Sequence, residues 1–237
     1  MHSFRKSISV CIATFNGERF ISEQISSIIH QLSPIDEIII SDNGSSDNTL
    51  EIIKEFNDSR IKIYHYSEPN VLKNFENAIS KAKNNVIILC DQDDVWLPNR
   101  IDSIINEHKH YDLVTVRYRV IDAKLQVLSE QNRLPVKSFW ATILKNGYIG
   151  CGMSFNKEII EDILPFPRTI AMHDWWIALL CLTKYKVLNI DEVLFLYRRH
   201  GNNVSSTSEK SRFNFFEKIN MRIRILCLIF LRLLKIR

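Results

Sequence analysis

The sequence predicts an α/β fold in which a mostly parallel sheet is flanked by helices. Three observations carry this prediction. Over residues 1–96, apolar and largely β-branched runs alternate with segments whose apolar residues recur at helical spacing. The connections between them are short, which favours right-handed crossovers and parallel strands. Polar turns follow three of the expected strands, and the carboxyl ends of parallel strands meet at one edge of a sheet.

The first half of the chain alternates strictly between the two kinds of element. Asp47 is expected to cap the second helix, because an Asp side chain can accept from the free N–H groups of a first turn. The expected elements, in order, are strand 7–14, helix 18–31, strand 36–41, helix 47–56, strand 61–66, helix 71–83 and a strand that ends at residue 90.

The second half has a less regular pattern. Pro98 is tolerated in the first turn of a helix, and the three glycines at 147–155 indicate a strand that another group approaches closely. The expected elements are a helix to about residue 110, strand 111–120, a hairpin turn at 121–126, a loop and short helix over 130–147, strand 147–155, a buried helix at 175–182, and short strands at 187–190 and 193–197.

The composition is that of an ordinary globular protein. The chain has 237 residues, 46% hydrophobic and 24% charged, which fits one large domain or a domain with an appendage. Its five cysteines are odd in number, widely spaced and without a CxxC pair, so buried free thiols in a reducing cytosol are expected. The first residues lack the apolar segment of a signal peptide, which favours a cytoplasmic location.

The net charge of +4 is distributed unevenly. Residues 209–237 contain eight Lys and Arg against two Glu, which gives +6, so residues 1–208 sum to −2. The basic character therefore belongs to the C-terminus, and the body predicts no nucleic-acid partner.

An acid cluster ends the strand at residue 90. The sequence Asp91-Gln92-Asp93-Asp94 places three carboxylates within four positions, where they repel one another unless a cation lies among them. Oxygen ligands suit Mg²⁺ or Mn²⁺, which also bind substrate phosphates. A solvated turn is the alternative interpretation.

Five short motifs extend this pattern over most of the chain. They are VCIATFN at 10–16, SDNGS at 41–45, CDQDDVW at 90–96, HDWW at 173–176 and YRRHGNNVS at 197–205. With these motifs in this order, residues 6–205 resemble the family 2 glycosyltransferases of the GT-A fold, in particular bacterial enzymes that build surface polysaccharides. The last two motifs resemble rhamnosyltransferase-type members.

The resemblance implies a GT-A domain at 1–205, with a nucleotide-binding half at about 1–96 and an acceptor half at 97–205. It implies that Asp42 hydrogen-bonds a pyrimidine base, although an Asx turn also explains this stretch. Asn43 stands where the family often has a second Asp. It further implies that Asp93 binds the metal and that Asp91 contacts the metal, the ribose or the donor sugar. The remaining implied donor contacts are Thr14, Asn16, Glu18, Lys73, Gln92 and Arg199.

On the acceptor side the resemblance implies that Asp174 is the catalytic base. Inversion at the anomeric carbon needs one carboxylate to take the proton of the attacking hydroxyl, and a helix N-cap is the alternative role. His200 is implied as a metal ligand or diphosphate contact, against a basic surface loop as the alternative. Gly150 and Gly152 are expected to leave room for a sugar.

The C-terminal segment 206–237 is expected to be a basic amphipathic helix on a membrane. Its longest uninterrupted apolar run has seven residues, far short of the ~20 that span a bilayer. Long apolar residues flanked by Arg and Lys are typical of helices that lie on an anionic leaflet. The alternative is a helix docked on the catalytic domain or on a second subunit.

These observations predict a metal-dependent, inverting glycosyltransferase on the inner face of the cell membrane. Its donor would be a UDP- or dTDP-sugar, and its acceptor a hydroxyl of a growing, lipid-linked glycan. A sugar nucleotidyltransferase is an alternative, but the turn at 14–18 has one glycine and an acid where a triphosphate loop would be glycine-rich and basic. A non-catalytic nucleotide-sugar-binding protein is the other alternative.

Overall fold

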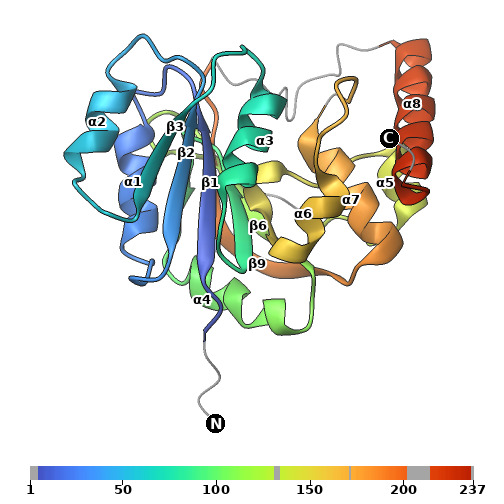
Figure 1. Cartoon of the computed structure of the whole chain (residues 1–237), viewed down its shortest axis with the longest axis horizontal. Helices are drawn as coiled ribbons and strands as arrows, with labels where there is room; N and C mark the ends of the chain where they lie inside the picture. Colours follow the sequence, from blue (N-terminus) through green and yellow to red (C-terminus); the bar gives the residue numbers. More distant parts are fainter. Residues whose placement is uncertain (1–4, 131–133, 171, 202–213, 236–237) are drawn as a thin grey trace.

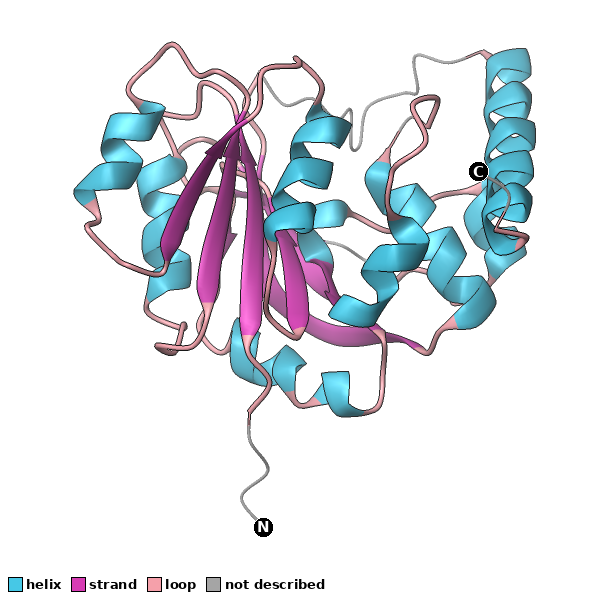
Figure 2. Cartoon of the chain, viewed as in Figure 1, coloured by secondary structure: helices cyan, strands magenta, loops and turns pink. Residues whose placement is uncertain are grey.

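The computed structural model describes residues 5–130, 134–170, 172–201 and 214–235. Its centre is a nine-stranded sheet with helices on both faces (Figures 1 and 2). The strand order is β3-β2-β1-β4-β8-β6-β9-β5, and β7 pairs with β6 outside this path. The predicted α/β class is confirmed.

The first half of the sheet forms as the sequence predicts, with parallel strands joined by helices. The strands are β1 (Ile8–Thr14), β2 (Glu37–Asp42), β3 (Ile61–His65) and β4 (Val86–Cys90), and the helices are α1 (Ile21–Ile29), α2 (Thr49–Glu55) and α3 (Val71–Lys81). The predicted cap of α2 is wrong by one residue. Asn48 occupies the N-cap position, and Asp47 accepts a hydrogen bond from the backbone N–H of Thr49 instead.

The second half of the sheet is mixed. Strand β8 (Met153–Asn156) runs antiparallel to both β4 and β6 (Leu113–Ile121), whereas β9 (Val187–Arg198) runs parallel to β6. The prediction of two strands at 187–190 and 193–197 was wrong, because register shifts beside Arg117 absorb the polar residues 191 and 192 within one long strand. The remaining strands are β5 (Val95–Trp96), antiparallel to β9, and β7 (Val127–Glu130).

The predicted strand at 147–155 is shorter than expected. Residues Gly150–Gly152 form a turn of 3-10 helix, and β8 begins only at Met153. The helices of this half are α4 (Arg100–Ile105), α5 (Phe139–Leu144), α6 (Ile160–Ile163), α7 (His173–Lys184) and α8 (Phe215–Leu233).

Two apolar cores lie on the two faces of the sheet. Because side chains alternate along a strand, Val10 and Ile12 of β1 face a core that α1, α2 and α4 cover, whereas Cys11 faces a core under α3, α6 and α7. Helix α8 closes the second core with Ile225 and Ile229 (Figure 1). Four cysteines are buried as expected, but Cys227 of α8 is exposed.

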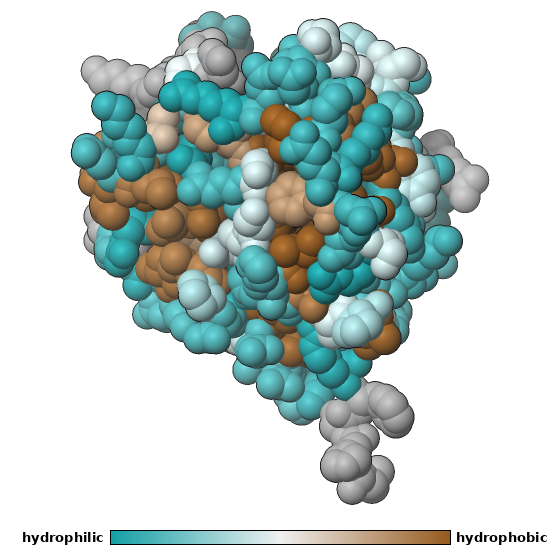
Figure 3. All heavy atoms as spheres, turned by 90° about the vertical axis from the view of Figure 1, so that its left-hand side faces the viewer, coloured by the Kyte–Doolittle hydropathy of each residue, from teal (hydrophilic) through white to brown (hydrophobic). Residues whose placement is uncertain are grey.

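Strand β3 forms one edge of the sheet. Its residues are half-buried except for the exposed His65, and the ammonium group of Lys62 lies 2.6 Å from the Glu37 carboxylate. The surface that contains this edge shows apolar areas broken up by hydrophilic side chains (Figure 3). A charged side chain on an edge strand disfavours pairing with a second chain.

Candidate active site

The turns that follow β1 and β2 are joined by side-chain hydrogen bonds at the carboxyl edge of the sheet. The Asn16 side-chain carbonyl accepts from the backbone N–H of Ser46 at 2.8 Å, and the Asn16 N–H donates to Ser45 Oγ at 2.9 Å. The Glu18 carboxylate accepts from the backbone and the side-chain amide of Asn48 at 3.0 and 2.9 Å. The predicted convergence of these turns is confirmed.

Asp42 organises the second turn from within. Its carboxylate is fully buried and accepts from Thr14 Oγ1 at 3.0 Å, from the N–H groups of Gly44 and Ser45 at 3.0 and 2.9 Å, and from Ser45 Oγ at 2.6 Å. The Asx turn that the sequence offered as the alternative is therefore present. A role toward a pyrimidine base stays a prediction.

Asn43 connects this turn to the segment between β3 and α3. Its side-chain amide donates to the carbonyls of Tyr66 and Glu68 at 2.9 and 2.7 Å, and its Oδ1 accepts from the N–H of Asn70 at 3.2 Å. An Asp carboxylate accepts only and could not make the first two bonds. The departure from the family's usual residue therefore has a structural reason.

Gln92 joins the acid turn after β4 to the turn after β1. Its Oε1 accepts from the N–H of Phe15 at 2.9 Å, and its Nε2 donates to the Phe15 carbonyl at 3.0 Å. A Cβ atom on Gly17 would lie 2.5 Å from the same Oε1, so this glycine makes room for the Gln92 amide. All three polar turns thus form one hydrogen-bonded platform.

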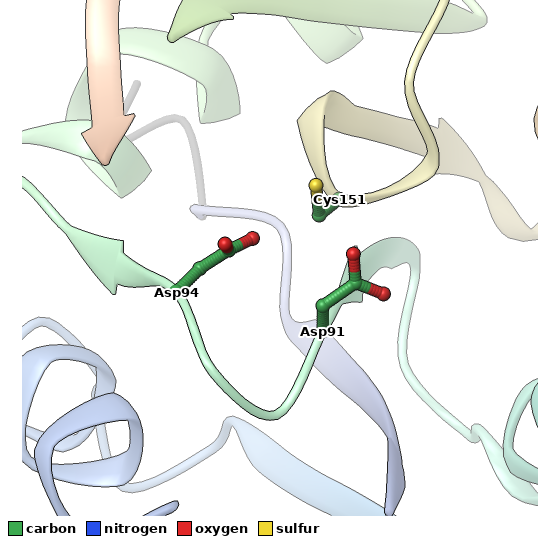
Figure 4. Close-up of side chains that lie close together, drawn as sticks. All are labelled: Asp91, Asp94 and Cys151. Carbon is green, nitrogen blue, oxygen red and sulfur yellow. The ribbon is translucent and has the colours of Figure 1, made fainter. Parts of the chain in front are cut away.

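The acid turn brings two carboxylates together with a thiol. Ligand atoms of Asp91, Asp94 and Cys151 all lie within 4.8 Å of one another, with the two acids on the turn after β4 and the thiol on the 3-10 turn before β8 (Figure 4). Burial and the charge of Asp93 raise the pKa of Asp91 to about 7 and also raise that of Asp94. Among the described residues, Asp94 Oδ2 is buried without a hydrogen-bond partner. A cation would offset both the repulsion and this lost bond.

His200 lies against the third acid of the turn. Its Nε2 is 2.7 Å from Asp93 Oδ2, and its ring centroid is 4.7 Å from that of Phe20. A set of carboxylates with one imidazole suits Mn²⁺ or Mg²⁺, so the residues present fit the metal that the sequence predicts. Whether His200 binds it stays a prediction.

Arg198 fastens the end of β9 to the acid turn. Its backbone N–H donates to Asp94 Oδ1 at 3.0 Å, and its Nε donates to the Asp93 carbonyl at 2.7 Å. Arg198 is 1% exposed, and the His200 side chain, for which a basic surface loop was the alternative interpretation, is 13% exposed. The backbone N–H of Arg199 continues the pairing with β6 by donating to the Ile121 carbonyl at 2.8 Å. Residues 202–205 of this motif lie outside the described residues.

Asp174 is a buried acid in the first turn of α7. Its Oδ1 accepts from the N–H of Trp175 and from the Asn146 side-chain amide, the latter at 3.2 Å. Burial raises its pKa to about 7, although these hydrogen bonds lower it in part. The N-cap of α7 is Met172, so the alternative role of Asp174 as the cap is wrong. Its charge adds in a minor way to the raised pKa of Asp91, so the two carboxylates lie near enough to repel each other.

The expectation that Gly150 and Gly152 leave room for a sugar was wrong. A Cβ atom on Gly150 would lie 2.3 Å from His173 Nε2, and one on Gly152 would lie 3.1 Å from the Ile149 side chain. Protein atoms therefore fill the space that these glycines leave. The His173 ring is 4.4 Å from that of Phe75.

The Lys73 ammonium group is already bonded to other protein groups. Its ammonium group lies 3.0 and 2.9 Å from the two carboxylate oxygens of Glu76 and 3.3 Å from the Phe166 carbonyl. It lines a groove of about 430 Å³ between α3 and the segment at 160–165, whose lining does not include Asp93 or Asp174.

Three residues of the site escaped the sequence analysis. Asn146 positions Asp174, Arg198 positions the acid turn, and Cys151 contributes the thiol. The position of Cys151 between two glycines was a usable signal, since the close approach they permit brings the thiol to the acids. Asn146 carries no signal in the sequence.

Comparison with known proteins identifies related sequences. Residues 9–164 match the family model described as Glycosyl transferase family 2. The chain is 31% identical over 214 residues to the dTDP-rhamnosyl transferase RfbG of Shigella flexneri, covering 81% of this chain and 72% of that protein. It is 26% identical over 208 residues to the UDP-Glc:alpha-D-GlcNAc-diphosphoundecaprenol beta-1,3-glucosyltransferase WfgD of Escherichia coli, covering 86% and 81%.

Solved structures share the fold at low sequence identity. A crystal structure of S. aureus TarS 1-349 superimposes with a TM-score of 0.71 at 17% identity, covering 95% of this chain and 65% of that one. The mannosyltransferase PcManGT of Pyrobaculum calidifontis, in complex with GDP-Man and Mn²⁺, gives a TM-score of 0.62 at 17% identity, covering 85% and 59%. The chain thus spans somewhat less than two thirds of both structures, and the similarity is one of fold.

Proposed function

This chain belongs to glycosyl transferase family 2, and from that premise we propose that it is a metal-dependent, inverting glycosyltransferase of polysaccharide biosynthesis. The proposed reaction moves a sugar from a UDP- or dTDP-sugar to a hydroxyl group of a lipid-linked glycan. One observation carries the proposal: Asp174 is a buried carboxylate with a raised pKa, near enough to Asp91 of the acid turn to repel it.

The platform of three turns is the proposed donor side. Parallel strands place their ligands at this edge of an open sheet, and residues 1–96 supply all three turns. Because their side chains already bond one another, the turns require little ordering when a nucleotide-sugar binds. The names of the relatives support this side of the proposal, since RfbG is described as a dTDP-rhamnosyl transferase and WfgD as using UDP-Glc.

Asp93, Asp91 and His200 are the residues proposed to hold Mg²⁺ or Mn²⁺. The 2.7 Å contact between Asp93 and His200 supports these two residues, and the position of Asp91 within 4.8 Å of a second carboxylate, that of Asp94, supports the third. A bound divalent cation supplies charge neutralisation of the diphosphate leaving group. Arg198 holds the turn so that its carboxylates are in place before the donor arrives.

Asp174 is the proposed general base. The hydrogen bonds from Asn146 and Trp175 go to Oδ1, so Oδ2 is the oxygen proposed to accept the proton of the acceptor hydroxyl. A pKa of about 7 makes a carboxylate far more basic than usual while it stays largely ionised at slightly alkaline pH. As the hydroxyl oxygen attacks the anomeric carbon from the face opposite the leaving group, its proton passes to Asp174 and the configuration inverts.

The test compares two carboxylates with a control. Donor binding is measured by calorimetry with UDP-glucose and dTDP-rhamnose in Mn²⁺, and transfer with a lipid-linked GlcNAc-diphosphate acceptor. We expect Asp174→Asn to bind donor normally and to lose transfer by ~10²–10⁴-fold. Asp93→Asn should lose the Mn²⁺-dependent part of donor binding, and Asp102→Asn, an exposed acid on α4, should change neither.

Two outcomes contradict the proposal. Wild-type transfer by Asp174→Asn would remove its assignment as the base. Tight donor binding by the wild-type protein without transfer to any acceptor of a lipid extract would favour the non-catalytic alternative.

A further inference from the structure

Helix α8 docks on the body of the protein through one face only. Ile225 and Ile229 are 3% and 2% exposed. The Arg222 guanidinium donates to the carbonyls of Ile143 and Leu144 at 3.2 and 2.6 Å. Arg232 donates to three carbonyls between residues 162 and 165 and stacks 5.2 Å from the Trp176 ring. Two half-buried arginines of the segment therefore fix α8 in place.

The opposite face of α8 is apolar and exposed. Phe216, Ile223, Phe230 and Leu234 are 79%, 55%, 62% and 52% exposed. Their spacing of seven, seven and four residues places them in one stripe along a helix of 3.6 residues per turn. A helix that packs on one side and faces water on the other would carry polar side chains in this stripe.

Helix α5, beside α8, carries two further exposed apolar side chains. Trp140 and Leu144 are 67% and 65% exposed, and α5 lies beside α8 because Arg222 bonds the carbonyls at its end. By helical spacing, the half-buried Ile219 and Leu226 fall between Arg222 and the stripe. We call this region the α5–α8 surface, defined by Trp140, Leu144, Phe216, Ile223, Phe230 and Leu234.

The two segments that form this surface are strongly basic. Residues 134–147 contain two Lys and no acid, and residues 214–235 contain five Lys and Arg against one Glu. Arg222 and Arg232 among them bond the body of the protein, which leaves Lys218, Arg224 and Lys235 for other partners. The two segments sum to +2 and +4, so the remainder of the chain, whose total is +4, carries −2. An exposed apolar stripe within a basic surface complements an anionic lipid leaflet.

We propose that the α5–α8 surface rests on an anionic lipid bilayer, with its aromatic and aliphatic side chains among the headgroups. No helix in the described ranges is long and apolar enough to cross a membrane. In this proposal the outer stripe of the docked helix α8 contacts the lipid together with α5.

The same surface is adjacent to the proposed base. Asn146, two residues beyond Leu144, donates to Asp174, and the Trp175 indole N–H donates to the Thr142 carbonyl of α5 at 2.8 Å. An acceptor carried by a lipid would meet the site from the bilayer side. This last point rests on the proposed function, whereas the attachment itself does not.

The experiment uses single exposed side chains, because removing α8 would uncover Ile225, Ile229 and the core beneath them. Sedimentation is measured with phosphatidylcholine vesicles that contain or lack 30% phosphatidylglycerol, without donor, cation or acceptor. Wild type should bind the anionic vesicles and lose binding at high salt. Phe230→Ser and Trp140→Ser should each weaken binding about tenfold.

The matched control is Leu128→Ser on β7, which removes an equally exposed apolar side chain, 58% exposed, from another part of the molecule. It should bind as wild type does. Thermal unfolding of each variant checks that the fold is intact. Absence of wild-type binding to anionic vesicles, or equal binding by Phe230→Ser, Trp140→Ser and wild type, overturns the proposal.

A second copy of the chain could cover the α5–α8 surface in place of lipid. Light scattering without lipid distinguishes it: a wild-type dimer that Phe230→Ser converts to monomers would make this face a subunit interface and overturn the proposal. Because vesicle binding needs no turnover, its outcome is independent of the result with Asp174→Asn.

Discussion

Two regions of the candidate site differ in how completely their polar groups are bonded: the links between the three turns, and the surroundings of Asp174. The carboxylates at the metal end of the acid turn are an exception on the donor side, because Asp94 Oδ2 is buried without a partner among the described residues. On the donor side, Asp42 accepts four hydrogen bonds and the amide of Gln92 uses both of its ends. On the acceptor side, His173 Nε2 and the Tyr148 hydroxyl are buried without partners in the described part of the chain, and the pKa of Asp174 is raised by burial. Hydrogen bonds between the turns fix the shape of the donor side. Burial of a carboxylate such as Asp174 raises its pKa and so makes it a stronger base.

The largest expected effect concerns pH and the acceptor side. With a pKa of about 7, Asp174 is progressively protonated below neutrality. A protonated base cannot accept the hydroxyl proton, so kcat should fall ~10-fold per pH unit and ~100-fold by pH 5. The measurement is kcat at saturating donor between pH 5 and 8.5.

The control for this profile is stability over the same range. The folded protein holds the Asp174 proton more tightly than the unfolded chain, whose carboxyl has a pKa near 3.8. Stability from this group is therefore fully present below that value and is lost as the pH rises through about 7. Acidification does not unfold the protein through Asp174. A flat rate profile across neutrality would contradict the assignment.

The next effect concerns crowding on the acceptor side. Gly150→Ala places a Cβ atom 2.3 Å from His173 Nε2, and the ring, packed beside Phe75 and buried, has little freedom to move. We expect a loss of about 2 kcal/mol in the free energy of unfolding, measured by urea titration. Gly201→Ala is the matched control because nothing lies within 4 Å of its Cβ position. Equal urea midpoints for Gly150→Ala and Gly201→Ala would contradict this expectation and show that the His173 ring can move aside at little cost.

A smaller loss is expected on the donor side. Asn43→Asp removes both donors to the carbonyls of Tyr66 and Glu68 and places a carboxylate against them. The free energy of unfolding should fall by about 1.5 kcal/mol. The exposed Asn106 offers the same chemical change without these two hydrogen bonds, so Asn106→Asp should be neutral. A stable Asn43→Asp variant would mean that the platform rearranges and is not fixed.

The smallest effect is expected at Gln92, where donor binding should change more than stability. Gln92→Glu keeps an acceptor for the N–H of Phe15 but cannot donate to the Phe15 carbonyl. Losing one such bond, worth about 1 kcal/mol, should weaken donor binding about fivefold in calorimetry. The thermal midpoint is measured in parallel. Unchanged donor affinity would show that the acid turn does not need its link to the turn after β1.

The same division explains what the sequence could predict. Strands β1 to β4 alternate with amphipathic helices, so local pattern was sufficient to predict them, although β4 pairs with β1 and not with β3, its neighbour along the chain. The acid turn was recognisable because three carboxylates after an apolar run are unusual. Strand β9 was misjudged, since its continuity depends on register shifts against β6 that no local pattern records.

Side chains that act across the fold were the hardest to predict. The bond between Arg198 and Asp94 joins residues 104 positions apart, and that between Asn146 and Asp174 joins residues 28 apart. Helix α8 posed a different problem, because Ile229 and Phe230 are equally apolar in sequence although one is buried and the other exposed. Only the packed structure separates them.

The hydrogen bonds from Arg198 to Asp93 and Asp94, called the Arg198 clamp here, can form only late in synthesis of the chain. Asp94 and His200 lie at opposite ends of a stretch that a ribosome makes at roughly 5–20 residues per second. The first four strands can pair as soon as they emerge, but the acid turn lacks its clamp until Arg198 follows. A nascent chain therefore lacks the Arg198 bonds to its acid turn for roughly 5–20 s, and the proposed metal ligands are all present only after the last strand of the sheet has been made.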